Sequence, residues 1–404
     1  MIEIEFSMIP DSEQDTEIIS KMLDDFRSRN QINVQVHKMT WGEAWPVLLT
    51  TASHGKGPDV SHIGSTWVSS LVIMNALRPF NAMEVAATGG SQAFVAPAWQ
   101  GGIVEGDTRI WSMPWTSYFY VICYRKDLLQ KAGIEENAAF SKLESLLGTV
   151  RSLHSLDVVY PWLMPYIPSP YNDLLHTAAS WIWDAGGDFL SHDAKHTVFN
   201  QPLSRAGLKG FIELHRAVPE KAVSFENQKC IDMFLQKQAA AILVDVRDAH
   251  ELLKGSDVKL RSNIGITVLS SVPWFGSSNL VVWRHVQGYP ERERAALSLI
   301  NFLTGHRAQT MLAQNSSAVP ARLDAISEIF PSGHPLANTL TQTSRSGRQY
   351  RSVALWHRIE FQLSFALGEM LIDACADRAI DGEDLITKHI DPLATRLDLI
   401  LSDR

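Results

Sequence analysis

The sequence predicts an α/β fold organised in two domains. Its 404 residues exceed what a single hydrophobic core usually supports. Hydrophobic residues make up 45% of the chain and charged residues 20%, so there is enough apolar material for two cores. Near the N-terminus, short segments with period-two alternation are followed by longer segments with apolar residues at helical spacing. This alternation predicts mainly parallel sheets with helices on both faces.

The N-terminal third reads as repeated strand–helix units. Residues 2–8 alternate apolar and polar side chains, which predicts a strand, and "PDSEQDTEIISKMLDDFRSRN" then offers Asp and Ser caps before a helix. "INVQVHKM" predicts a second strand and "WGEAWPVLLTTAS" a second helix. After a Gly-Pro break, "GPDVSHIGS" predicts a short third strand.

The rest of the chain is mainly helical. We expect helices in "RKDLLQKAGI", over 140–154, 172–185, 292–304 and 307–315, and from residue 354 onward. Apolar strands are expected in "MPWTSYFYVICY", "AAAILVDVR", "NIGITVL" and "NLVVWRHV". Neither a repeat of fixed period nor a low-complexity linker interrupts the sequence, so we expect two interleaved domains.

Composition excludes several classes of partner. The net charge of -8 comes without a concentrated basic face, which argues against nucleic acid. Arg345, Arg348 and Arg351 form a short basic cluster that fits a solvated loop or a seam between domains. The three cysteines are far apart and lie among apolar neighbours, as small buried side chains do. No run reaches the roughly 18 to 20 apolar residues of a membrane span.

Candidate ligand residues follow the predicted N-terminal strands. In open α/β sheets, ligands bind outside the carboxyl ends of the strands, on loops that lead into helices. Here those loops carry polar and aromatic side chains, which suit a ligand better than a core. The residues are Asp11, Glu13, Trp41, Ser65, Thr66 and Trp67.

Six blocks of the sequence, in order, resemble carbohydrate-binding receptors of ABC importers. They are "GPDVSHIGSTWVSSLVIMNALRPF", "MPWTSYFYVICYRKDLLQKAGI", "FLQKQAAAILV", "NIGITVL" with "GSSNLVVW", "ALSLINFLTGHRAQTMLAQNSSAVPAR" and "LWHRIE". The resemblance, to the family that includes maltose-binding protein, covers nearly the whole chain. It implies a type II periplasmic-binding-protein fold with two hinged lobes. By analogy, lobe one holds residues 1–110 and 262–318, and lobe two holds 111–261 and 319–404, with the ligand cleft between them.

The same resemblance implies a function and its partners. The chain would capture a mono- or oligosaccharide and deliver it to the permease subunits of an ABC transporter. It would act in the periplasm or outside the cell, free or with a lipid anchor, as a monomer without a cofactor. A signal segment, absent from this chain, would belong to the precursor.

A sugar site needs flat aromatic rings for C–H faces and side chains that both donate and accept hydrogen bonds. Trp67, Trp115 and Trp274 stand beside polar or small residues at strand ends, so they are the favoured rings. Trp41 and Trp183 are weaker candidates, since they could mark helix ends. For each ring, packing in the core is the alternative.

Further candidates come from two later segments and from the strand that carries Trp115. Asp245 and Arg247 follow "AAILV" and could hold sugar hydroxyls or form a local ion pair. Gly276, Ser277 and Asn279 could offer hydrogen bonds from a tight turn. Tyr118 stays undecided between ligand contact and core. Asp11 and Glu13 could equally complement a helix dipole.

Signatures of catalysis and of metal binding are lacking. The sequence has no G-x-S-x-G, H-E-x-x-H or phosphate-loop motif. His192 and His196 are four apart but read as loop without a third ligand, so we expect no metal site. We therefore expect a receptor and not an enzyme. The rival functions are a glycosidase using a pair among Asp184, Asp188 and Asp245, and a receptor for a signalling kinase.

Overall fold

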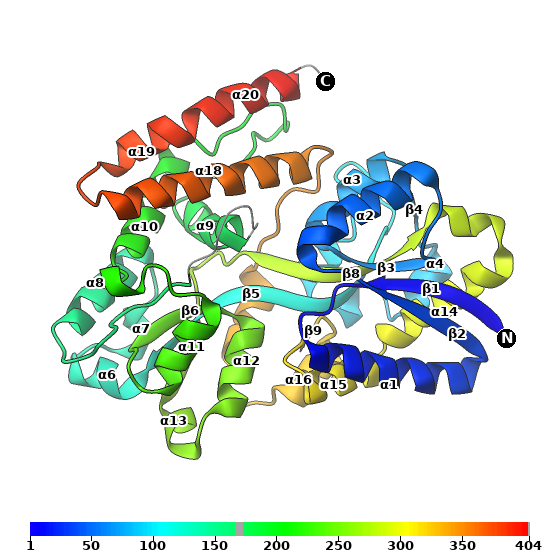
Figure 1. Cartoon of the computed structure of the whole chain (residues 1–404), viewed down its shortest axis with the longest axis horizontal. Coiled ribbons are helices and arrows are strands. Elements are labelled where there is room, and N and C mark those ends of the chain that lie inside the picture. The colour runs from blue at the N-terminus through cyan, green and yellow to red at the C-terminus, as the bar shows by residue number, and fades with distance from the viewer. Residues whose placement is uncertain (166–172, 403–404) are drawn as a thin grey trace. The chain divides into compact units, whose positions relative to one another are not determined.

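The computed structural model describes residues 1–165 and 173–402. The chain forms two compact units, each built from more than one segment. Unit 1 comprises Met1–Tyr118, Phe275–Ala337 and Gln349–His357, and unit 2 comprises Phe119–Trp274, Asn338–Arg348 and Arg358–Arg404. Figure 1 shows the elements of both units.

Unit 1 is a mixed sheet flanked by helices. Its strands are β1 (Ile2–Met8), β2 (Ile32–Lys38), β3 (Val60–Gly64), β4 (Leu77–Arg78), the first part of β5 (Met113–Arg125), β8 (Phe275–Trp283) and β9 (Val319–Pro320). Its helices are α1 (Glu13–Asn30), α2 (Trp41–His54), α3 (Val68–Ile73), α4 (Ala82–Ala87), α5 (Ala96–Gln100), α14 (Pro290–Leu303), α15 (His306–Asn315) and α16 (Leu323–Ile329). The short 3-10 turns are η1 (Ser65–Trp67), η2 (Ser91–Ala93) and η4 (Arg284–Gly288).

The predicted strand–helix units are found at the start of unit 1. Strand β1 lies between β2 and β3 and pairs parallel with both. The Ser12 hydroxyl caps α1 by accepting a hydrogen bond from the Asp15 N–H at 3.0 Å. Strand β8 runs antiparallel to β3, with Gly64 opposite Ser278. The N-terminal end of β8 therefore lies at the same sheet edge as the carboxyl ends of β1, β2 and β3.

Unit 2 contains the second part of β5 with β6 (Ala241–Asp245) and β7 (Ile264–Val268). Its helices are α6 (Lys126–Lys131), α7 (Glu136–Ala139), α8 (Leu143–His154), α9 (Asp173–Asp184), α10 (Pro202–Arg216), α11 (Asn227–Leu235), α12 (Val246–Gly255), α13 (Val258–Asn263), α17 (Ala337–Ser346), α18 (Trp356–Ala376), α19 (Gly382–His389) and α20 (Asp391–Ser402), and its 3-10 turn is η3 (Glu220–Ala222). Helix α9 confirms the expected helix over 172–185, of which Asn172 lies outside the described residues.

Close packing of helices builds the core of unit 2. Helix α10 crosses α9 at Gly207, where a Cβ atom would lie only 2.5 Å from the Trp181 carbonyl oxygen. In the first turn of α10, the Arg205 side chain forms an ion pair with Asp391 at 2.7 Å, which ties α10 to α20. Helices α18 and α20 lie side by side, joined by the Arg396–Gln362 hydrogen bond at 3.1 Å (Figure 1).

The strand directions correct one expectation. The α/β class is confirmed, but among the named strands of the described residues parallel pairing is limited to β1, β2 and β3, besides isolated parallel bridges such as Leu163 with Ile242 of β6. The other named pairs in both units are antiparallel, including β5 with β6, β7 and β9. Helices separate these later strands too, as α12 and α13 separate β6 from β7, so an intervening helix does not by itself make neighbouring strands parallel.

The unit boundaries differ from the expected lobe boundaries in four places: residues 111–118, 319–337 and 349–357 belong to unit 1, and residues 262–274 belong to unit 2. Residues 262–274 pack in unit 2 because β7 pairs with β5, with Tyr124 opposite Gly265. Residues 319–337 pack in unit 1 because β9 pairs with β5 at Thr116 and Ser117. That two lobes move about a hinge stays a prediction.

Candidate functional site

An exposed indole stands at the start of α2 in unit 1. Trp41 is 39% exposed, and its Nε1–H donates to Asp11 Oδ1 at 2.9 Å. Asp11 lies in the loop that follows β1, whereas Trp41 follows β2. The hydrogen bond therefore joins two of the loops that the sequence predicts as ligand loops. It orients the ring while one part of its surface stays open to solvent.

Trp67 lies beside Trp41 but is buried. It ends η1, directly after Ser65 and Thr66, and only 6% of it is exposed. Its ring centroid is 5.6 Å from that of Trp41 and 5.6 Å from that of Trp45. Neighbouring rings thus cover Trp67, and Trp41 is the most exposed of the three.

His62 is a member of this site that sequence reasoning missed. It lies on β3, and its ring packs at nearly right angles to Trp41 at 5.6 Å and to Trp115 at 5.0 Å between centroids. The Ile9 N–H donates to His62 Nδ1 at 3.2 Å. Burial lowers the pKa of the imidazole to about 3, so the ring is neutral at physiological pH. We call Asp11, Trp41, His62, Trp67 and Trp115 the Trp41 cluster.

Trp115 closes the inner side of the Trp41 cluster. Only 3% of it is exposed, and the Phe6 ring lies against it at 6.2 Å between centroids. Its Nε1–H is buried and has no hydrogen-bond partner in the described part of the chain. Tyr118, three residues further along β5, is half-buried. Which of these two contacts a ligand stays a prediction.

The predicted residues of β8 lie at the same sheet edge and are all buried. The Ser277 N–H donates to Ser65 Oγ at 3.4 Å, and Asn279 Nδ2 donates to Ser112 Oγ at 2.7 Å. Gly276 precedes them in the strand, which pairs with β3 and forms no tight turn. The structure therefore brings Ser65, Ser277 and Asn279 to the same end of the strands, but each of these residues is less than 9% exposed.

Unit 2 holds a second group, the Arg348 cluster of Trp183, Asp188, Arg348 and Trp274. The Arg348 guanidinium lies 4.7 Å above the Trp183 ring centroid and donates to Asp188 Oδ2 at 2.6 Å. Trp183 Nε1–H donates to the other carboxylate oxygen of Asp188 at 3.2 Å. A cation therefore covers a face of this predicted sugar-binding ring.

Trp274 joins the Arg348 cluster through the backbone. The Arg348 N–H donates to the carbonyl oxygen of Pro273 at 2.9 Å, and Trp274 forms a bridge with Arg348. The His176 ring stacks flat on Trp274, with centroids 3.9 Å apart and planes at 8°. The imidazole therefore occupies one face of this favoured ring, and Trp274 is only 4% exposed. Burial lowers the pKa of His176 to about 3, so its ring is neutral.

Two further predicted polar residues have local roles in unit 2. Asp245 caps α12, because its Oδ1 accepts from the N–H groups of Arg247 at 2.7 Å and Asp248 at 2.9 Å. Burial raises the pKa of the Asp245 carboxyl, and burial lowers the pKa of Arg247 to about 10. In unit 1, Glu13 is exposed in the first turn of α1, where its charge complements the helix dipole.

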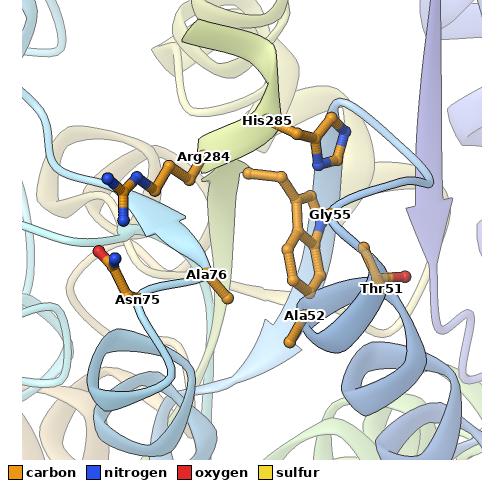
Figure 2. Close-up of a pocket in the computed structure, with 8 residues that line it drawn as sticks. Thr51, Ala52, Gly55, Asn75, Ala76, Arg284 and His285 are labelled. Carbon is orange, nitrogen blue, oxygen red and sulfur yellow. The ribbon is translucent and has the colours of Figure 1, made fainter.

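A pocket of about 290 Å³ lies at the opposite edge of the unit 1 sheet. It is lined by Thr51, Ala52, Gly55, Asn75, Ala76, Trp283, Arg284 and His285. Figure 2 shows Arg284 extending toward Asn75, with His285 on the other side of the pocket. It includes none of the predicted ligand residues and lies by the C-terminal end of β8, away from the Trp41 cluster.

The described residues show neither a metal-binding cluster nor a membrane-spanning helix. Within 1–165 and 173–402, no group of three or more His, Cys, Asp or Glu side chains is placed to hold a metal ion. Over the same ranges, no helix combines the length and apolarity needed to cross a membrane.

An α/β fold in two lobes, with aromatic rings and hydrogen-bonding side chains placed after the strands, defines a binding protein for a small solute. Residues 21–337 match the family described as bacterial extracellular solute-binding protein, and the chain belongs to this family. No curated protein matches the chain.

Solved structures share the fold at low sequence identity. Maltose-bound MalE3 of T. maritima has a TM-score of 0.79 at 20% identity, over 99% of this chain and 100% of that one. MalE of Xanthomonas citri has a TM-score of 0.78 at 18% identity, covering 100% and 98%. A solute-binding protein from Thermotoga lettingae bound with α-D-tagatose has a TM-score of 0.77 at 16% identity, covering 99% and 100%. The family and these neighbours are binding proteins and not enzymes.

Proposed function

We propose that this protein is the sugar-binding receptor of an ABC importer. Its family collects extracellular solute-binding proteins, and similar structures hold maltose or tagatose. The observation that carries the proposal is the exposed Trp41 ring, which Asp11 holds by a hydrogen bond of 2.9 Å. An oriented indole is suited to the apolar face of a sugar ring, while carboxylate oxygens accept from its hydroxyls.

Both units contribute to binding in this proposal. Unit 1 supplies the Trp41 cluster, and unit 2 supplies the Trp183 ring of the Arg348 cluster, whose covering Arg348 side chain is 38% exposed and would be displaced by the sugar. Closure of the two lobes around the sugar would then create the form that the permease subunits recognise. The protein would act as a monomer in the periplasm or outside the cell.

The carboxylates that a glycosidase would need are engaged in local contacts. Asp184 accepts hydrogen bonds from the backbone N–H and the hydroxyl of Ser271. Asp188 pairs with Arg348, and Asp245 caps α12. These contacts favour structural roles for all three and support a receptor over the enzymatic alternative.

A ligand panel tests the proposal. Thermal unfolding and calorimetry would be measured with maltose, D-tagatose and ribitol as neutral ligands, D-glucuronate as an acidic sugar and leucine as a control. We expect at least one neutral sugar to raise the melting temperature in a concentration-dependent way, because a ligand that binds only the folded state stabilises it. A response to leucine with none to any sugar or polyol would overturn the proposal.

A further inference from the structure

The hydrogen bond from Ile9 determines which His62 nitrogen carries the proton. The Ile9 N–H donates to Nδ1, so Nδ1 must offer its lone pair and cannot carry a hydrogen. In the neutral ring the proton is therefore on Nε2. That Nε2–H group is buried, and no acceptor for it is found in the described part of the chain.

A second N–H donor lies next to it. Trp115 Nε1–H is likewise buried without an acceptor among the described residues, and the two rings are 5.0 Å apart at 87°. Buried donors are nearly always paired in folded proteins, because an unpaired one loses its hydrogen bonds with water and gains none. Two unpaired donors on adjoining rings, at the edge where the ligand loops converge, therefore indicate a place for an acceptor atom.

The surroundings limit which acceptor fits. No cation of the Trp41 cluster accompanies the two donors, and the Asp11 carboxylate, which accepts from Trp41 Nε1–H, would repel an anion. An uncharged oxygen, such as a sugar hydroxyl or ring oxygen, meets neither obstacle. Trp41 lies at nearly right angles to His62, at 5.6 Å between centroids, and is the most exposed ring of the cluster, so a sugar held on Trp41 would lie next to His62.

We propose that His62 Nε2–H and Trp115 Nε1–H together bind one oxygen of an uncharged sugar, which makes His62 a specificity-determining residue. This inference rests on the proposed function. It assigns Trp115 a role as hydrogen-bond donor through its ring edge, in place of a stacking role through its face.

Two substitutions at residue 62 separate the ligand role from the structural one. In His62→Asn, the amide oxygen lies near the position of Nδ1 and can still accept from Ile9, but nothing reaches the position of Nε2. In His62→Gln, the amide group reaches the position of Nε2 and can donate there, but the acceptor for Ile9 is lost. We expect His62→Asn to bind the sugar about tenfold more weakly with a nearly unchanged melting temperature. We expect His62→Gln to melt lower but to keep most of the affinity.

Both variants would be measured by calorimetry with the neutral sugar that binds the wild type. Their melting temperatures would be measured without sugar. If His62→Asn binds as tightly as the wild type, the inference is overturned, and the N–H group only packs on the Trp115 ring. If the residue 62 variants do not fold, Trp115→Phe, which keeps an aromatic ring but lacks the indole N–H, should weaken binding about tenfold, while unchanged affinity would overturn the inference. A wild type that responds to leucine and to no sugar or polyol would refute the proposed function itself, before any variant is compared.

Discussion

Trp41 Nε1 and Asp11 Oδ1 are 2.9 Å apart, and this hydrogen bond joins the first turn of α2 to the loop after β1. The two residues are 30 positions apart in sequence, yet parallel pairing of β1 with β2 brings their loops to one edge. A ring held in this way loses little conformational freedom when a ligand stacks on it, because its orientation is already restricted. This arrangement makes Trp41 the leading candidate for contact with the sugar.

Replacing Trp41 by Ala should weaken sugar binding ten- to a hundredfold, because a stacking surface worth about 1–3 kcal/mol is lost. Since Trp41 is 39% exposed, melting of the protein without sugar should change little. Met83→Ala, at a side chain that is 84% exposed on α4, serves as the matched control and should keep full affinity. Calorimetry with an identified sugar measures both variants, and unchanged affinity in Trp41→Ala would remove Trp41 from the site.

Replacing Trp115 by Ala should lower the free energy of unfolding by about 3–5 kcal/mol, because a buried indole is removed from between Phe6 and His62. Trp115→Phe keeps most of that packing and should cost much less. Urea unfolding without sugar gives both values. If Trp115→Ala is nearly as stable as the wild type, the ring is an open stacking surface, as the sequence alone suggests.

The comparison of Trp41 with Trp67 and Trp115 shows how far the sequence leads. Periodicity and capping residues predict β1, α1, β2, α2 and β3, and strand ends predict where ligand loops gather. The exposure of each indole depends on partners distant in sequence, such as Phe6 for Trp115, and the residues next to an indole in the sequence do not predict these partners. For the same reason His62 could not be predicted as a site residue. In the sequence it is an ordinary strand residue, and only the structure shows its contacts with Trp41 and Ile9.

Stability in acid should depend on His62. Its pKa is about 3 in the fold and 6.5 in the unfolded chain, so below pH 6.5 the unfolded state binds a proton that the folded state does not. The stabilisation is complete above pH 7 and decreases as the pH falls from 6.5 toward 3. Relative to His62→Asn, the wild type should lose on the order of 2 kcal/mol of unfolding free energy between pH 7 and pH 5.

Urea unfolding of the two proteins at pH 7, 6 and 5 measures this difference. The comparison is necessary because burial raises the pKa of Asp173 and Asp245. In both proteins these carboxyls increase the unfolding free energy as the pH falls, which is opposite to the effect of His62. A difference in stability between wild type and His62→Asn that does not vary with pH would show that burial does not lower the pKa of His62 below its value in the unfolded chain.

The guanidinium of Arg348 should compete with the ligand for the face of Trp183. It lies 4.7 Å above the ring and is held by Asp188, so a sugar that stacks on this face must first displace it. A site that is covered part of the time binds with an affinity reduced by the uncovered fraction. Because such a cation–π contact is worth about 0.5–1 kcal/mol at exposed sites, Arg348→Ala should bind sugar about two- to fivefold more tightly.

The gain should disappear in a Trp183→Ala background, where no ring remains to be uncovered. If Arg348→Ala lowers the melting temperature and leaves the affinity unchanged, Trp183 and Arg348 only stabilise unit 2, and the sugar contacts of that unit lie elsewhere.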